Sequence, residues 1–489
     1  MIKKVLIANR GAIAFRIIRT LKKAGIQSVA VYSEEDRESL HVAHADEAFS
    51  LGAGAARNTY LDIEKIFAVV KTAGVHAIHP GYGFLSENPD FVERCETEGV
   101  IFLGPTADQM RVFGLKHTAR DLAEKAGVPL LPGTGLLTDL NQALDEAEKI
   151  VYPVMLKSTA GGGGIGMQIC QTREALSTCF ESVKRMGENN FSNAGVFLEK
   201  YIERARHIEV QIFGDGLGGV VALGERDCSS QRRNQKVIEE APAPNLSDET
   251  RRALHQTARQ LVASVDYRSA GTVEFILDQQ TGEFYFLEVN TRLRVEHGVT
   301  EEVYGVDIVA WMLELAGGTD FDVEKKASTL KAGGHAIQVR LYAEDPQKAF
   351  QPSAGLLSEV CFPEQKKGVR IDRWIEAGVV VPPYFDPMLA KVICHAASRE
   401  EAIEKMSAVL GETSIYGIET NVRYLQGILR DPVLLEGTMY TRYLNDMPYA
   451  AHSMEVLSAG TFTTVQDYPG RTGYWSVGVP PSGPFDALG

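Results

Sequence analysis

A run of glycines constrains the fold of this chain more than any other feature of its sequence. The run comprises Gly161, Gly162, Gly163, Gly164 and, after one isoleucine, Gly166. It lies between strand-like segments at 154–157 and 167–170. The spacing satisfies the G-x-G-x-x-G pattern of dinucleotide-binding folds, but those folds need a helix to begin at the glycines. Strand, glycine loop and strand instead predict a flap that covers phosphates with backbone N–H groups. A glycine hairpin without a ligand is the alternative.

Two lysines accompany this flap. Lys157 lies four residues before the glycines, near the end of a predicted strand, and from there it could place a positive charge on a phosphate oxygen. Lys116 lies on a helix predicted over 110–127, where a lysine is more often a solvated charge.

The order of the predicted elements divides the chain into α/β and α+β regions. A strand at 4–8, a helix at 13–24 and a strand at 28–32 form a βαβ unit, which predicts a parallel sheet. Strands and helices mix irregularly afterwards, and a polar stretch at 320–334 indicates a boundary. We predict four regions, 1–113, 114–334 with a lid at about 133–204, 335–446 and 452–489.

Two predicted strands, 272–277 and 284–290, each carry an acid among apolar residues. Glu288 and Asn290 are two residues apart and therefore share one face of their strand, and Glu274 lies on the other strand. Carboxylate and amide oxygens on adjacent strands suit Mg²⁺ or Mn²⁺. A pair of acids on a solvent-exposed face is the alternative.

The residues that follow are rich in charge. Arg292, Arg294 and Glu296 alternate, so they share one face if the segment is extended. Two guanidinium groups beside a carboxylate would bind a small anion and offer a base to deprotonate it. A surface ladder of ion pairs is the alternative.

Upstream, residues 225–236 are polar and mostly charged, which predicts a functional loop. Residues 237–244 have neither helical nor strand periodicity and are interpreted as a connector.

Composition excludes several classes of protein. The formal net charge of −14 argues against a surface for nucleic acid or anionic membrane. No apolar run reaches about 18 residues, so we expect no membrane span. The N-terminal apolar run is too short for a signal peptide. Six cysteines without a C-x-x-C pair indicate reduced thiols in a cytoplasmic protein.

Together these segments resemble the biotin carboxylase family. The matching segments occur in the family's order, and they are IANRGAIAFRIIRT (7–20), HPGYGFLSEN (79–88), GGGGIGM (161–167), ERDCSSQRRNQKVIEEAPAP (225–244), EVNTRLRVEH (288–297), AEDP (343–346) and DPMLAKVI (386–393). The resemblance implies an N-terminal Rossmann-like domain, an ATP-grasp core with a glycine-rich lid and a C-terminal α+β domain. It also implies that ATP and bicarbonate form carboxyphosphate, which then carboxylates biotin.

The resemblance assigns roles to individual residues. ATP would be contacted by Lys116, Lys157, Glu199, His207, Gln231 and Asn234, and by the glycines of the lid. The divalent ions would be bound by Glu274, Glu288 and Asn290. Bicarbonate would be bound by Lys236, Arg292 and the backbone of Val295. Glu296 would be the general base, and Arg340 would stabilise the biotin enolate.

The chain departs from the family pattern at five positions, which are Ala12, Ile165, Asn234, Arg294 and Gln338. Of these, Ile165 and Asn234, together with residues 417–421, look like the urea carboxylase branch. The segments 460–467 and 478–484 are similar to the start of that branch's carboxyltransferase region. No Met-Lys-Met biotin-acceptor motif is present, so we expect a longer enzyme whose carrier and carboxyltransferase domains are partners of this region.

Other interpretations stay open at this point. A different ATP-grasp ligase would share the lid and the metal site but lack the anion cluster. A nucleotide-binding regulatory protein with an inactive site is the candidate from another class. Guanidine, or an acyl-CoA or pyruvate-type substrate, competes with urea as the final carboxyl acceptor. A homodimer is a further expectation.

Overall fold

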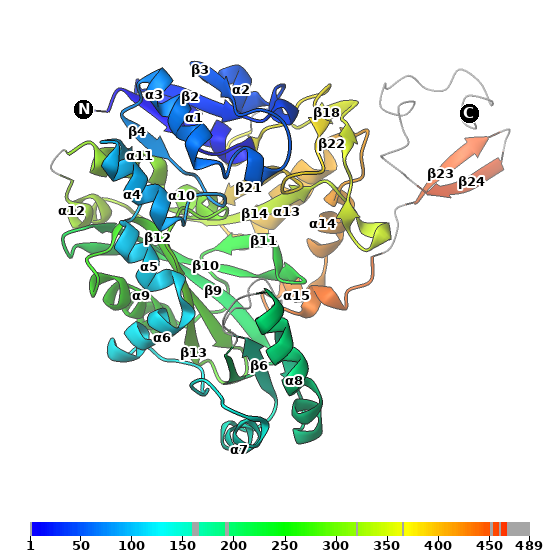
Figure 1. Cartoon of the computed structure of the whole chain (residues 1–489). Coiled ribbons are helices and arrows are strands. Elements are labelled where there is room, and N and C mark those ends of the chain that lie inside the picture. Colours follow the sequence, from blue (N-terminus) through cyan, green and yellow to red (C-terminus); the bar gives the residue numbers. More distant parts are fainter. Residues whose placement is uncertain are drawn as a thin grey trace.

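The computed structural model describes residues 2–158, 166–190, 195–318, 321–363, 366–449, 453–458 and 461–466 (Figure 1). The side chains of residues 116–117, 186–190 and 453–466 lie outside that description. The predicted glycine contacts at 161–164 also lie outside the described residues, whereas Gly166 is described.

The N-terminal region is a parallel five-stranded sheet in the order β3-β2-β1-β4-β5. Its strands are β1 (Lys4–Ile7), β2 (Gln27–Tyr32), β3 (Glu47–Ser50), β4 (Ala77–His79) and β5 (Ile101–Phe102). Helix α1 (Gly11–Lys23) follows β1 after a tight turn, in which Gly11 has a φ of 66°. The predicted α/β fold of this region is confirmed.

A continuous antiparallel sheet of eight strands forms the centre of the molecule (Figure 1). In spatial order the strands are β13 (Phe284–Asn290), β12 (Arg268–Asp278), β9 (Ala205–Asp215), β10 (Val220–Arg232), β11 (Gln235–Ala241), β14 (His335–Tyr342), β21 (Met388–Ala396) and β19 (Val369–Arg373). The predicted α+β character of this part is confirmed. The sheet runs without interruption across the expected boundary near residue 335, and the domain boundaries themselves stay predictions.

Two sequence predictions about this sheet are wrong. Residues 225–236 are not a loop, and the segment from 237 is not a connector, because strands β10 and β11 form a hairpin there. Both faces of these strands are buried, so the apolar and polar alternation of a half-exposed strand is missing. The hairpin turns at Arg233 and Asn234, whose φ values are 49° and 66°. Asparagine tolerates this left-handed conformation better than most residues.

The helix predicted over 110–127 is also wrong, because two helices occupy this stretch. They are α5 (Ala107–Gly114) and α6 (Lys116–Lys125). Leu115 separates them in an extended conformation, with φ −99° and ψ 119°.

The predicted lid is built on a three-stranded sheet in the order β7-β6-β8. The segments on either side of the glycine run, β6 (Val154–Ser158) and β7 (Met167–Cys170), pair in antiparallel fashion. The third strand is β8 (Val196–Lys200), and helices α7 (Leu140–Ile150) and α8 (Arg173–Asn190) cover the sheet. These elements form the lower lobe in Figure 1. The strand–glycine–strand order therefore produces paired strands, as the sequence predicted.

The remaining elements cover the two large sheets or form small ones. The helices are α2 (Leu40–His44), α3 (Ile63–Ala73), α4 (Pro89–Thr97), α9 (Asp248–Ala263), α10 (His297–Tyr304), α11 (Ile308–Ala316), α12 (Val323–Ser328), α13 (Arg399–Gly411), α14 (Val422–Ile428) and α15 (Pro432–Leu435). The short strands are β15 (Glu344–Asp345), β16 (Gln351–Pro352), β17 (Gly355–Leu356), β18 (Glu359–Cys361), β20 (Val380–Val381), β22 (Ser414–Tyr416), β23 (Ser453–Ser458) and β24 (Thr461–Gln466). None of the described helices has the length and apolar character needed to cross a bilayer.

A buried ionic network ties the N-terminal region to the central sheet. Arg16 on α1 donates to Glu301 on α10 at 2.9 Å and to Asp307 at 2.9 Å. Arg370 on β19 donates to the same Glu301 at 2.7 Å. Three segments that are distant in sequence thus meet at one carboxylate, which is 3% exposed.

We predict that Glu301→Gln destabilises the protein by about 3–5 kcal/mol, because the substitution removes the shared partner of two buried guanidinium groups. Burial raises the pKa of Glu301, but the guanidinium groups of Arg16 and Arg370 outweigh burial and hold it well below its usual range. The stabilisation is therefore present at neutral pH and is lost on acidification. Urea unfolding at several pH values measures it.

Glu302→Gln is the matched control. Glu302 lies 3.3 Å from Arg370, but its side chain is 29% exposed, so its loss should cost under about 1 kcal/mol. Equal losses in the two variants would contradict the network.

Candidate functional site

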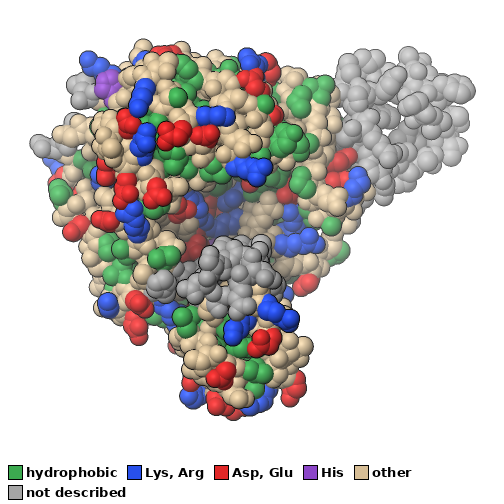
Figure 2. Space-filling view, viewed as in Figure 1, with side chains coloured by type: hydrophobic (Ala, Val, Ile, Leu, Met, Phe, Trp, Pro, Cys, Tyr) green, Lys and Arg blue, Asp and Glu red, His purple; other side chains and the backbone are tan. Residues whose placement is uncertain are grey.

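The expected site residues surround a hollow between the two large sheets. A cavity of about 350 Å³ is lined by the turn after β1, the loop at 82–84, Val295 and Arg340. Two further cavities of about 360 and 410 Å³ lie between the lid strands and β13, and both include Lys157 and Leu287 in their walls. Lys and Arg side chains gather in the hollow at the centre of the face in Figure 2.

The structure brings the three predicted metal ligands together. Glu274 and Glu288 are directly opposite each other on β12 and β13. Asn290 donates through Nδ2 to Glu274 at 2.9 Å and to Glu288 at 3.2 Å, and these contacts leave its Oδ1 directed elsewhere. The two carboxylates are hard oxygen ligands that suit Mg²⁺, and Asn290 Oδ1 would join them once its amide group turns over. The alternative of two acids on a solvent face is wrong for Glu274, which is 2% exposed.

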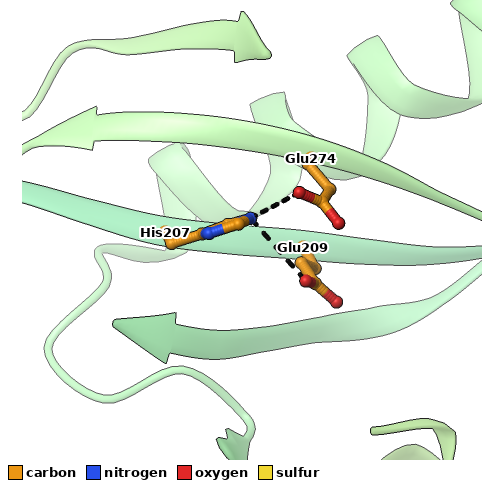
Figure 3. Close-up of side chains that lie close together, drawn as sticks. All are labelled: His207, Glu209 and Glu274. Atoms are coloured by element: carbon orange, nitrogen blue, oxygen red, sulfur yellow. Dashed lines mark hydrogen bonds and ion pairs between the residues drawn. The ribbon is translucent and has the colours of Figure 1, made fainter. Parts of the chain in front are cut away.

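His207 and Gln231, expected near the nucleotide, lie beside this acid pair. Gln231 Nε2 donates to His207 Nδ1 at 2.8 Å, so His207 donates through Nε2 to Glu274 at 2.6 Å. Glu209, two residues along the same face of β9, lies 3.6 Å from His207 (Figure 3). Sequence reasoning missed Glu209, although the i, i+2 spacing from His207 could have indicated it.

Glu296 lies at the centre of the site and contacts three cations. Lys236 Nζ is 2.9 Å from its carboxylate, Arg340 is 3.1 Å away and Arg294 is 3.2 Å away. Burial raises the pKa of Glu296, but these cations outweigh burial and hold the pKa well below its usual range. The carboxylate is therefore ionised and able to accept a proton, although it is a weak base in this state.

Lys236 joins the base to the metal ligands. It forms an ion pair with Glu209 and lies 3.6 Å from Glu274. Burial and Arg294 lower its pKa, but Glu209, Glu274 and Glu296 outweigh them, so the lysine keeps its charge.

Arg294 is buried, which contradicts a surface ladder of ion pairs. Its Nη1 donates to Asn290 Oδ1 at 2.6 Å, and its Nη2 lies 2.7 Å from Glu274. Its Nε reaches Glu296, as given above. Arg294 thus bridges the base and the predicted metal ligands.

The expectation of one extended face over 292–296 is wrong. The segment is an irregular turn, and Arg292 donates to Glu87 at 2.7 Å and to Asn290 at 3.2 Å. Within the described residues Arg292 has no contact with Glu296. Both arginines instead converge on the oxygen of Asn290. Glu87 belongs to one of the quoted motifs, but its role was not foreseen.

Arg340 is oriented by a second glutamate. It donates to Glu239 at 2.5 Å while also contacting Glu296, and Gln338 donates to Glu239 at 2.9 Å. Burial raises the pKa of Glu239, and Glu296 raises it further. Arg340 lowers it, but the pKa stays above its usual range. Arg340 lines the cavity of about 350 Å³ together with Tyr82 and Asp386. The roles of Glu239, Tyr82 and Asp386 beside Arg340 were not foreseen from the sequence.

The residues expected around the nucleotide lie at the junction of the lid and the central sheet. Lys157 and Glu199, on neighbouring lid strands, form an ion pair, and Arg120 on α6 donates to Glu199 at 3.0 Å. Asn234 lines the cavity of about 410 Å³. Gly166 is buried with a φ of 75°, whereas the side chain of Lys116 lies outside the described residues.

Comparisons with known proteins cover most of the chain. Family models match residues 1–110 (Biotin carboxylase, N-terminal domain), 116–324 (Carbamoyl-phosphate synthase L chain, ATP binding domain) and 338–446 (Biotin carboxylase C-terminal domain).

Two curated relatives and one solved structure illustrate the similarity. Urea amidolyase of Lachancea kluyveri is 52% identical over 99% of this chain, which spans only 26% of that protein. Biotin carboxylase 2 of Bacillus subtilis is 47% identical over 91% of this chain and 99% of its own length. The biotin carboxylase domain dimer of Hydrogenobacter thermophilus 2-oxoglutarate carboxylase, in complex with MgADP, ADP and bicarbonate, is 41% identical. It superposes with a TM-score of 0.85 over 91% of this chain and 98% of its own.

We predict that Glu288→Gln weakens Mn²⁺ binding at least about tenfold, because one of two anionic ligands is lost. Titration of the protein with Mn²⁺, followed by electron paramagnetic resonance with and without nucleotide, measures the free ion. Glu283→Gln, an exposed acid next to the start of β13, is the control and should bind Mn²⁺ as the parent does. If Glu288→Gln bound Mn²⁺ as tightly as the parent, Glu288 on β13 would not be a metal ligand.

Proposed function

Because the chain belongs to the biotin carboxylase family, we propose that it uses ATP and bicarbonate to carboxylate biotin. The resemblance in the sequence motifs is confirmed by the family models, and so are the α/β and α+β folds that it implied. One observation carries the proposal: a buried, ionised glutamate is surrounded by cations and lies beside a pair of metal-binding acids.

Bicarbonate is the small anion that this arrangement suits. Lys236, Arg292 and the backbone of Val295 would bind it, and Glu296 would remove its proton. Without an anion the cations depress the pKa of Glu296. A bound anion adds a like charge and shares those cations, which raises the pKa of Glu296. The base therefore becomes stronger when its substrate arrives.

ATP would be held between the lid and the central sheet. Lys157 and the lid glycines would contact the phosphates, joined by Lys116. The remaining contacts to the nucleotide would come from Glu199, His207, Gln231 and Asn234. Glu274, Glu288 and Asn290 would hold Mg²⁺, which neutralises charge on the transferring phosphoryl group when bound. Arg294 contacts both Glu274 and Asn290 Oδ1, so an ion bound there would take over contacts that Arg294 makes in this structure.

The proposed reaction has three steps. A bicarbonate oxygen attacks the γ-phosphorus of ATP, the bond to the bridging oxygen breaks, ADP leaves and Glu296 takes the bicarbonate proton. Carboxyphosphate then breaks down to CO₂ and phosphate. That phosphate takes the proton from the biotin ureido nitrogen, and this nitrogen forms a bond to CO₂. A closed lid would exclude water, which hydrolyses carboxyphosphate.

Biotin would enter the cavity of about 350 Å³, where Arg340 can stabilise the negative charge on the ureido oxygen. Glu239 and Glu296 hold the guanidinium on both sides, so its orientation is set before biotin arrives. Biotin would be delivered by a carrier domain, and the carboxylated product would pass to a carboxyltransferase domain.

Urea is the acceptor that the similarity favours. The urea amidolyase relative matches 99% of this chain, whereas the free-standing biotin carboxylase matches 91%. The similarity to the urea enzyme therefore extends further along the chain. We propose that the chain is part of a urea carboxylase. Guanidine is the alternative acceptor. The six cysteines are free, in keeping with the proposed cytoplasmic location, and a homodimer remains a proposal.

We predict that release of phosphate from MgATP depends on bicarbonate and rises when free biotin is added. Glu296→Gln should lower this rate by about 10²–10⁴-fold, because the general base is lost. Coupled assay of ADP with bicarbonate varied measures both effects, and Glu283→Gln serves as the control. ATP binding without bicarbonate-dependent turnover would favour the regulatory alternative.

We also predict that Arg294→Gln shifts the acidic limb of the pH profile of kcat/KM to higher pH. The substitution removes one of the cations that depress the pKa of Glu296. At neutral pH kcat should rise if base strength dominates, and KM for bicarbonate should rise if anion binding dominates. Arg294→Lys retains the charge and should keep the parental limb. Profiles of both variants that match the parent would show that Arg294 does not tune the base.

A further inference from the structure

The turn between β13 and α10 has two successive carbonyl groups held by side chains. The carbonyl of Arg294 accepts from His297 Nδ1 at 2.7 Å. The carbonyl of Val295 accepts from Lys391 Nζ at 2.8 Å. Lys391 lies on β21, 96 residues further along the chain, and is fully buried. Two donors from different elements thus hold adjacent peptide groups.

These bonds determine where the neighbouring N–H groups point. In a planar trans peptide the N–H points opposite to the C=O of the same unit. The bond to the Arg294 carbonyl therefore orients the N–H of Val295, and the bond to the Val295 carbonyl orients the N–H of Glu296. In the part of the chain that the structure describes, neither N–H donates to a protein acceptor. Val295 lines the cavity next to Arg340, and the N–H of Glu296 is the next donor along the same turn.

Lys391 is not needed to neutralise the charge of Asp372. The lysine lies 3.5 Å from Asp372, but this carboxylate also pairs with Arg19 and with Arg370 at 2.9 Å. Burial is the largest effect on Lys391 and lowers its pKa to about 8. The surroundings therefore do not favour a positive charge at this position. What Lys391 adds that the arginines do not is its hydrogen bond to Val295.

His297 acts through a hydrogen bond rather than through charge. Burial lowers its pKa to about 3, so the ring is neutral at physiological pH. A carbonyl oxygen can only accept, so Nδ1 carries the hydrogen that it donates to Arg294. The ring is fully buried, which fixes this orientation.

We propose that Lys391 and His297 are positioning residues for bicarbonate, because they aim the N–H groups of Val295 and Glu296 into the anion site. The inference rests on the proposed function. It adds two residues that touch neither bicarbonate nor ATP but determine whether the backbone can bind the anion. Both also fix the backbone of the base Glu296.

The first test is Lys391→Met, which keeps the length of the side chain and removes the donor. KM for bicarbonate should rise about tenfold or more, whereas KM for MgATP and the slow bicarbonate-independent ATP hydrolysis stay within about twofold. Lys405→Met is the control, because Lys405 also donates to a carbonyl of β21, that of His395 at 2.7 Å. It should leave KM for bicarbonate unchanged. An unchanged KM for bicarbonate in Lys391→Met, or equal rises for both substrates, would overturn the inference.

A pair of variants at His297 decides the question if Lys391→Met does not fold. His297→Asn keeps a donor near the position of Nδ1, and His297→Leu does not. The asparagine variant should keep KM for bicarbonate within about threefold, and the leucine variant should raise it as Lys391→Met does. Equal KM values in the two variants would overturn the inference. If the parent chain itself shows no bicarbonate-dependent ATP cleavage, the proposed function has failed instead.

Discussion

Mutual neutralisation of buried charges is the interaction on which the rest of this structure depends. Glu209 and Glu274 on the central sheet, and Glu296 in the turn before α10, are buried where an unpaired ion would cost several kcal/mol. Lys236 and Arg294 each contact more than one of these acids. The cations that a substrate anion needs are therefore in place before it binds, and little reorganisation is required when it does. An incoming anion would take over contacts that these cations make with Glu296. It would not enter an uncharged pocket.

The need to pair buried charges also limited how much of the fold could be predicted from the sequence. The strands at 167–170 and 284–290 were predicted at their observed bounds, because apolar residues and flanking turns mark them. Strands β10 and β11 were interpreted as a loop and a connector because they are rich in charge. Those charges are paired across strands inside the sheet, and periodicity along one strand carries no information about such pairs. Similarly, Gly114 at the end of α5 is the local signal for the break at Leu115, and a single glycine does not by itself divide a helical pattern.

The site was predictable where its residues lie close in sequence or belong to one motif. Glu274, Glu288 and Asn290 meet as expected, because two adjacent strands carry them. The partners Glu209, Glu239 and Lys391 were missed, because each acts on a residue of another element that is distant in the sequence. Arg292 shows the opposite failure, since alternation placed it beside Glu296 and the turn at 291–296 directs it to Glu87. Spacing locates a functional side chain, but the contacts that tune it depend on sheet order.

The uninterrupted central sheet also limits how this chain could be divided or recombined. Strands β14, β21 and β19 lie beyond the expected boundary near residue 335, yet they complete the sheet that carries Glu274 and Glu288. A protein cut there would expose the edge of β11 and leave Glu239 and Glu296 without Arg340. Splitting the gene at this point should therefore yield two fragments that recover activity only if they reassociate by β-strand pairing. In evolutionary terms, the unit that can be inherited or exchanged extends from the first strand to the end of this sheet and its covering helices.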